Sequence, residues 1–132
     1  MSMTNEQLEH IHTLLASYPA VKLGYLFGSR VNGKTGPLSD YDFAFYADER
    51  DTKRLFDIKI TLQQELSRLL ATDRVDVMLL NLAESPELKY AVISEGRLLY
   101  EMEGFRVLVE PKILNEYFDF RALLRRYALT RS

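Results

Sequence analysis

Residues 26–42 read Leu-Phe-Gly-Ser-Arg-Val-Asn-Gly-Lys-Thr-Gly-Pro-Leu-Ser-Asp-Tyr-Asp, and this stretch decides the fold. It joins two apolar runs, residues 21–27 and 40–47, that predict strands. Glycines and a proline break the segment between them, which predicts a loop. Asp40 and Asp42 stand at i and i+2 on the second strand, so their carboxylates are expected on the same face of the sheet.

Two neighbouring carboxylates repel each other unless a cation lies between them. Oxygen ligands of this kind suit Mg²⁺, which keeps several waters and takes phosphate oxygens as further ligands. The pair therefore predicts a magnesium site for a phosphorylated substrate. The alternative for Asp40 and Asp42 alone is two solvated acids at a strand edge.

The residues just upstream favour the phosphate interpretation. Gly28 lets the backbone approach a ligand closely, and N–H groups of a helical turn starting there would form an anion site. The Ser29 hydroxyl can donate to a phosphate oxygen, and Arg30 and Lys34 can neutralise phosphate charge. The alternative is an ordinary helix-capping turn that contains a serine.

A third acid, Asp76, stands in an apolar run over residues 74–80 that we interpret as a central strand buried on both faces. An unpaired charge in such a strand costs several kcal/mol. A salt bridge to Arg74 is one explanation. If the strand lies beside residues 40–47, Asp76 instead completes a three-carboxylate cluster with Asp40 and Asp42. Such a cluster with a glycine–serine turn indicates two-metal phosphoryl or nucleotidyl transfer.

The rest of the chain alternates helices and strands, which predicts an α/β fold around a small mixed sheet flanked by helices. Helical spacing and caps predict helices, and one further β-run predicts the last strand. The helices are expected over residues 4–17, 51–70, 86–94 and 111–129, and the strand over residues 97–101. We expect one domain over residues 1–132, with a core over about 4–101 and a helical tail over about 105–130.

Composition excludes several classes of protein. The chain has 132 residues, is 47% hydrophobic and 27% charged, and carries a formal net charge of −2. These values fit a globular domain, and the charge gives no general attraction to nucleic acid or anionic membranes. There is no cysteine, hence no disulfide or thiolate metal site. No apolar run approaches a membrane span and no signal peptide is visible, so we expect a cytoplasmic protein without a membrane partner.

The order Gly28-Ser29, ten residues, Asp40-x-Asp42 resembles the signature of the DNA polymerase beta-like nucleotidyltransferase superfamily. The run Arg-Val-Asp-Val over residues 74–77 matches that family's last carboxylate, and residues 95–101 resemble its last core strand. The resemblance covers about residues 10–101 and implies the nucleotidyltransferase fold. It implies that Asp40, Asp42 and Asp76 are catalytic ligands of two Mg²⁺ ions, and that Gly28, Ser29 and Arg30 bind the nucleotide, ATP.

Only about 30 residues follow that core, so we expect another molecule to bring the acceptor. In this the chain is similar to the minimal nucleotidyltransferase (MntA-like) antitoxins of HEPN–MNT toxin–antitoxin pairs. That resemblance implies transfer of AMP from ATP to a tyrosine of a HEPN-domain RNase toxin. Two alternatives stay open: an antitoxin that acts by occlusion without catalysis, and a small-molecule nucleotidyltransferase that needs a partner subunit.

Residues 121–131 carry four arginines and no acid, and aromatic residues interleave with them from residue 117 on. One interpretation is a helix that binds a partner protein through aromatic and arginine anchors. The other is an amphipathic helix packed on its own core, with basic residues favourable near its C-terminus. The acidic balance of the whole chain disfavours nucleic acid as the ligand.

Overall fold

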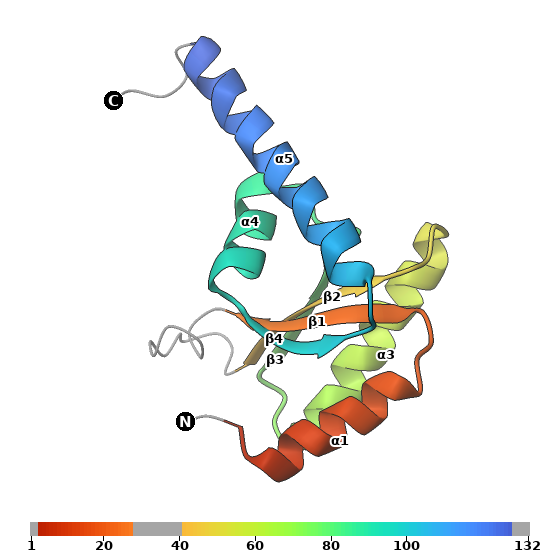
Figure 1. Cartoon of the computed structure of the whole chain (residues 1–132). Helices are drawn as coiled ribbons and strands as arrows, with labels where there is room; N and C mark the ends of the chain where they lie inside the picture. Colours follow the sequence, from red (N-terminus) through yellow and green to blue (C-terminus); the bar gives the residue numbers. More distant parts are fainter. Residues whose placement is uncertain (1–2, 28–40, 128–132) are drawn as a thin grey trace.

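The computed structural model of the chain describes residues 3–27 and 41–127. Helices and strands alternate after an initial helix and a pair of strands (Figure 1). The elements are α1 (Asn5–Ala16), β1 (Val21–Phe27), β2 (Tyr41–Ala47), α3 (Thr52–Leu70), β3 (Val75–Leu79), α4 (Pro86–Glu95), β4 (Arg97–Glu101) and α5 (Phe105–Arg126).

The four strands form one mixed sheet in the order β3-β2-β1-β4. β1 pairs antiparallel with both β2 and β4, and β2 pairs parallel with β3. The predicted mixed sheet flanked by helices is therefore confirmed. The prediction that β3 is a central strand is wrong, because β3 lies at the edge and Asp76 on it is exposed. Its apolar residues made it resemble a strand buried on both faces, but Val75, Val77 and Leu79 pack on one face only.

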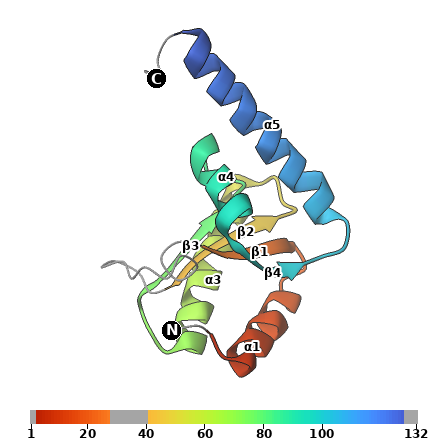
Figure 2. The same ribbon diagram turned by 60° about the vertical axis from the view of Figure 1, so that its left-hand side comes forward.

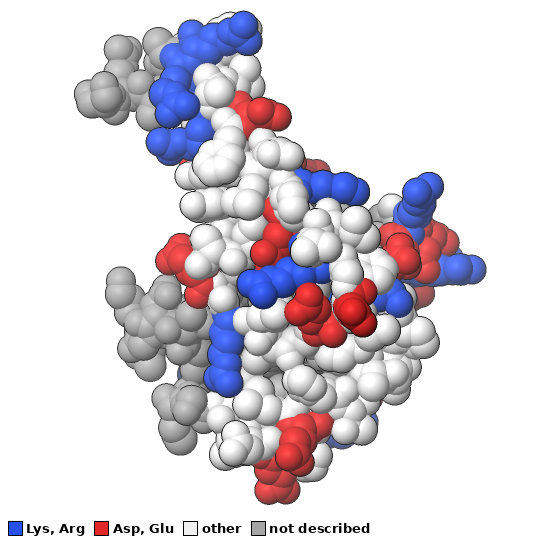
Figure 3. Space-filling view, viewed as in Figure 1, with Lys and Arg blue, Asp and Glu red and all other residues white. Residues whose placement is uncertain are grey.

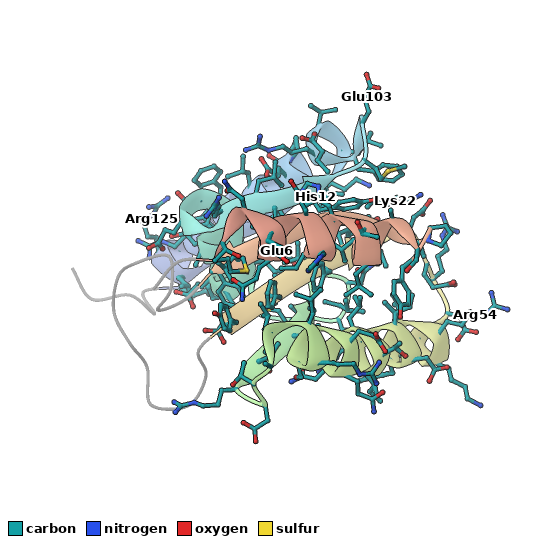
Figure 4. The ribbon with its side chains drawn as sticks, turned by 90° about the horizontal axis from the view of Figure 1, so that it is seen from below. Glu6, His12, Lys22, Arg54, Glu103 and Arg125 are labelled. Atoms are coloured by element: carbon teal, nitrogen blue, oxygen red, sulfur yellow. The ribbon has the colours of Figure 1, made fainter. Side chains whose placement is uncertain are left out.

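Helices cover both faces of the sheet (Figures 1 and 2). α1 and α3 lie side by side under one face, as Figure 4 shows from below. Leu15, Leu62 and Leu66 are fully buried there against Phe43 and Phe45. α4 and α5 pack on the opposite face, around a smaller core that includes Leu23, Tyr25, Val92, Val109 and Ile113.

Local signals in the sequence explain where most helices begin. Thr4 and Gln7 form a capping box in which each side chain binds the other residue's backbone N–H. Asp51 caps α3 and Ser85 caps α4 by accepting backbone N–H groups of the first turn. α4 also has Pro86 at its first position, where proline removes no intrahelical hydrogen bond.

The start of α5 differs from the prediction. The helix begins at Phe105 after Gly104 (φ 90°), and Pro111 lies inside it. An internal proline costs about 3 kcal/mol because it removes one hydrogen bond and crowds the preceding turn. Tertiary contacts of that first stretch offset the cost: Val109 is buried, and Glu110 accepts a 2.7 Å hydrogen bond from the Tyr25 hydroxyl on β1.

Candidate active site

The structure brings two of the three predicted carboxylates together. Asp42 and Asp76 are direct partners across the parallel β2–β3 pair, where neighbouring strands lie about 4.8 Å apart. Phe43 and Val77, next to them, pack into the α1/α3 core. By alternation Asp42 and Asp76 belong to the opposite face, which α4 and α5 cover only partly. The expectation that the third strand lies beside the second is confirmed.

Two side-chain amides bind the backbone near the ends of the β2–β3 pair. At one end, Asn81 exchanges two hydrogen bonds with the backbone of Ala47, of 3.0 and 2.8 Å. At the other, the amide of Gln63 on α3 bonds the outer edge of β3, donating to the Val75 carbonyl and accepting the Val77 N–H at 2.9 Å. A slip of one residue would send one carboxylate to the other face. The Asn81–Ala47 bonds oppose such a slip, whereas the Gln63 bonds attach β3 to α3.

The remaining predicted site residues, Gly28, Ser29, Arg30 and Asp40, lie outside the described part of the chain. Their neighbours in sequence are placed: Phe27 ends β1, Tyr41 begins β2, and Phe27 is the direct partner of Asp42. The expected phosphate-binding turn is thus joined directly to the end of β1 nearest the described carboxylates.

Among residues 3–27 and 41–127, no hydrogen bond or ion pair explains Asp76 as a packing residue. Within the described residues it forms no ion pair with Arg74, so that salt bridge is absent. Asp76 is exposed and Asp42 is half-buried. Neither carboxylate is fully buried, so a cation can approach both of them from solvent.

A cavity of about 440 Å³ opens in front of the two carboxylates. Sequence analysis did not single out its other walls, because they come from separate elements. Lys59 reaches it from α3, and Leu88 from α4. The cavity is lined by Phe27, Asp42, Lys59, Asp76, Met78, Leu79, Leu82, Ala83 and Leu88. It therefore combines two anions and one cation with an apolar wall.

The donor set fits a divalent metal that prefers oxygen. Asp42 and Asp76 supply paired carboxylates on one face, and the described side-chain nitrogen that lines the cavity, that of Lys59, is a cation and no ligand. No group of three potential metal-binding side chains gathers among residues 3–27 and 41–127. The predicted third ligand, Asp40, falls outside those ranges.

A second cavity, of about 720 Å³, lies at the opposite end of β2, between that strand and α5. Its walls carry both charge signs, including Asp48, Arg50 and Lys112. Lys89 in its wall is paired with Glu116 at 2.7 Å. Because Asp42 and Asp76 do not line it, we do not assign the nucleotide chemistry to this larger cavity.

The second half of α5 projects beyond the sheet (Figures 1 and 2). Tyr117 stacks on Tyr90 of α4, with ring centroids 3.9 Å apart, but Phe118, Leu123 and Tyr127 are exposed. Basic residues gather toward the end of this helix, as the space-filling view shows (Figure 3); in α5 they include Arg121, Arg125 and Arg126. None of the helices in the described chain has the length and apolar character to cross a membrane.

Comparisons with known proteins agree with this geometry. The family model of polymerase beta nucleotidyltransferases matches residues 9–104, well over half of the chain. Among solved structures, the chain is similar to an MNT antitoxin in complex with a tri-AMPylated HEPN toxin of Shewanella oneidensis. Identity there is 26%, the match covers 96% of each chain and the TM-score is 0.71.

Two further solved structures match over similar lengths. A toxin–antitoxin complex with AMP-PNP gives 28% identity, coverage of 95% of this chain and 96% of the other, and a TM-score of 0.71. A MntA–HepT toxin–antitoxin complex gives 26% identity, the same coverages and a TM-score of 0.70. No curated protein matched the sequence significantly. The family model spans β1 to β4, including the paired carboxylates on β2 and β3. The chain therefore belongs to the polymerase beta nucleotidyltransferase family.

Proposed function

We propose that this protein is an antitoxin that transfers AMP from ATP to a tyrosine of a cognate HEPN-domain RNase toxin and thereby inactivates it. The observation that carries the proposal is the pairing of Asp42 with Asp76 at the mouth of a cavity, next to the end of β1 that leads into Gly28-Ser29. The solved relatives support the choice of partner: one antitoxin is bound to a tri-AMPylated HEPN toxin, and another complex contains AMP-PNP.

The roles of the site residues follow from their chemistry. Asp40, Asp42 and Asp76 would hold two Mg²⁺ ions, which when bound neutralise the triphosphate and make the acceptor hydroxyl more acidic. Gly28 and Ser29 would bind phosphate oxygens through backbone and hydroxyl donors, and Arg30 would add positive charge. Asp76, at the edge strand, stands where an acceptor carried by another protein can reach it. ATP is abundant in the cytoplasm, where we place the protein.

AMP attached to a tyrosine adds a phosphodiester anion and a bulky nucleoside to the toxin. Near an RNase site this modification would obstruct RNA and repel its phosphates. Because the bond is covalent, the toxin stays silent after the two proteins separate. A small amount of this protein should therefore inactivate an excess of toxin.

The test incubates the protein with a tenfold excess of its HEPN toxin, ATP and Mg²⁺, separates the two, and measures the mass and RNase activity of the toxin. We expect added AMP and lost RNase activity throughout the excess. Asp42→Asn should give neither, whereas Asp48→Asn, at the other end of β2, should act like the wild type. An unmodified toxin inhibited only at equal amounts would overturn the catalytic proposal.

A second candidate, inhibition by occlusion, is favoured by the projecting half of α5. Exposed aromatic residues beside arginines are the residue types that dominate the binding energy of protein interfaces. Occlusion predicts that Asp42→Asn inhibits the toxin as well as the wild type does. It also predicts that Phe118→Ala, which truncates an exposed aromatic side chain of α5, weakens inhibition.

A further inference from the structure

We propose that the β3 side of the cavity lined by Asp42 and Asp76 receives the acceptor tyrosine, and that Lys59 holds the phenolate oxygen of that tyrosine. The inference rests on the proposed function and deepens it. It concerns a residue on α3, a helix that otherwise covers the far face of the sheet.

Lys59 reaches the cavity because of how α3 meets the edge strand. Gln63 binds the backbone of β3 on both sides of Asp76, at Val75 and Val77. Lys59 precedes Gln63 by four residues, so both side chains lie on one side of α3. Lys59 is half-buried and lines the cavity with Asp42 and Asp76. It forms no hydrogen bond or ion pair with any described residue, which leaves its ammonium group available for a ligand.

The uncharged part of the cavity wall suits a flat apolar group of the acceptor. Met78, Leu82 and Ala83 line the cavity beside the charged side chains, and Leu88 stands there 41% exposed. A tyrosine matches both the apolar and the charged part of the cavity, because its ring covers the apolar wall while its oxygen reaches the charged residues. A serine or threonine acceptor would leave that wall in contact with water. The volume of about 440 Å³ falls within the size range of small-molecule sites.

The order of the strands separates the two substrates. Gly28-Ser29, the predicted phosphate-binding pair, follows β1, and β2 lies between β1 and β3. Lys59 approaches from beyond β3, on the side away from β1. The triphosphate is therefore assigned to the β1 side of the carboxylates, and the acceptor to the β3 side.

The reaction at this site forms one bond to phosphorus and breaks one, after the tyrosine hydroxyl has lost its proton. The phenolate oxygen attacks the α-phosphorus of ATP and forms the new oxygen–phosphorus bond. The bond from that phosphorus to the oxygen bridging to the β-phosphate breaks, pyrophosphate leaves with the electron pair, and the phenolic proton goes to solvent. Asp42, Asp76 and Lys59 are the charged described residues that line the cavity. Of these, only the Lys59 ammonium favours the phenolate form of a tyrosine, whose ordinary pKa is about 10.

The first test compares Lys59→Met with Lys59→Arg and with Lys53→Met, a matched change of an exposed lysine on the same helix. We expect Lys59→Met to slow AMP transfer to the HEPN toxin about tenfold at pH 7, the effect of shifting the acceptor pKa by one unit. ATP affinity should stay within about twofold, and the other two variants should keep most of the activity. Thermal midpoints of all three report on folding.

A second measurement distinguishes acceptor activation from a structural role. Toxin prepared with 3-fluorotyrosine has phenols that ionise at lower pH, so it should restore most of the rate lost in Lys59→Met. Leu88→Gln should raise the KM for toxin and leave ATP affinity unchanged. Val107→Gln, which removes a 75% exposed apolar side chain from α5, serves as its control.

The outcomes separate the two proposals. If the wild type transfers no AMP to the toxin, the proposed function itself is overturned. If the wild type is active and both Lys59→Met and Leu88→Gln match it, only the acceptor site is overturned. A loss of ATP affinity in Lys59→Met as large as its loss of transfer would assign Lys59 to the triphosphate and also contradict the inference.

Discussion

The two faces of the sheet differ in how completely helices cover them. On the α1/α3 face, large apolar side chains such as Phe43, Phe45 and Leu62 are completely buried. On the α4/α5 face, the core is smaller and the helices leave a cavity near each end of β2. Both described site carboxylates belong to this second face. A closed face can supply rigidity while the open face keeps room for substrates.

The same contrast appears in how the helices are attached to the sheet. α3 binds the edge of β3 through Gln63, so a helix of the closed face fixes the position of residues on the open face. α5 is anchored to the open face by its first half only, through Val109, Ile113 and the Tyr25–Glu110 hydrogen bond. The closed face should therefore dominate stability, and the open face should dominate activity.

The largest expected effect on stability is at the closed face. Leu62→Ala removes a fully buried side chain of α3 and should lower the free energy of unfolding by about 3 kcal/mol. Leu123→Ala, which truncates a leucine of α5 that is 47% exposed, should change it by less than about 0.5 kcal/mol. Urea unfolding of both variants measures the difference, and equal losses would contradict the contrast between the faces.

A smaller effect is expected where α5 meets the sheet. Tyr25→Phe deletes the hydroxyl that donates to Glu110 and should cost about 1.5 kcal/mol. Burial, and then the hydrogen bond to the Glu110 carboxylate, raise the pKa of Tyr25 above its ordinary value of 10.0. The unfolded chain thus loses this proton first as pH rises.

It follows that the stabilisation by Tyr25 is fully present below about pH 10 and declines above it. The stability difference between wild type and Tyr25→Phe should be constant from pH 7 to 9 and shrink at higher pH. Unfolding curves across that range check the sign. A difference that grows above pH 10 would contradict the anchoring role of this hydroxyl.

The smallest effect is expected at the amide that covers the edge strand. Gln63→Ala removes two hydrogen bonds to a solvent-accessible edge and should cost about 1 kcal/mol. Gln64→Ala, at the exposed neighbouring position, provides the control and should have almost no effect. Amide hydrogen exchange at Val77 should speed up in the first variant alone, and protection retained in Gln63→Ala would show that the bond does not hold β3.

The sequence was sufficient for elements whose signals are local. The strand over residues 21–27 and the strand over 97–101 have the predicted bounds, and the capping residues Thr4, Asp51 and Ser85 mark the starts of their helices. Each of these signals depends on neighbours within one turn or one strand. Side-chain alternation likewise predicts the face on which Asp42 lies, and the parallel pairing of β3 with β2 puts Asp76 beside it.

The features that the sequence did not predict depend on contacts between residues far apart in the chain. The edge position of β3 follows from strand order, which an apolar run does not encode. The first six residues of α5 end at Glu110, which Tyr25, 85 positions away in the chain, binds, so the helical spacing from residue 111 on predicted the start too late. Lys59 was missed for the same reason: its connection to the site runs through Gln63 and the edge of β3.

The most direct test of the central claim is AMP transfer by Asp42→Asn. The claim is that the paired carboxylates of β2 and β3 perform chemistry and do not support the fold. Replacing one charged oxygen ligand should lower transfer to the HEPN toxin about a thousandfold, since metal-dependent charge stabilisation is worth several kcal/mol. The thermal midpoint without Mg²⁺ should stay the same or rise, because repulsion between Asp42 and Asp76 is relieved. A stably folded Asp42→Asn protein that transfers AMP at the wild-type rate would contradict the account.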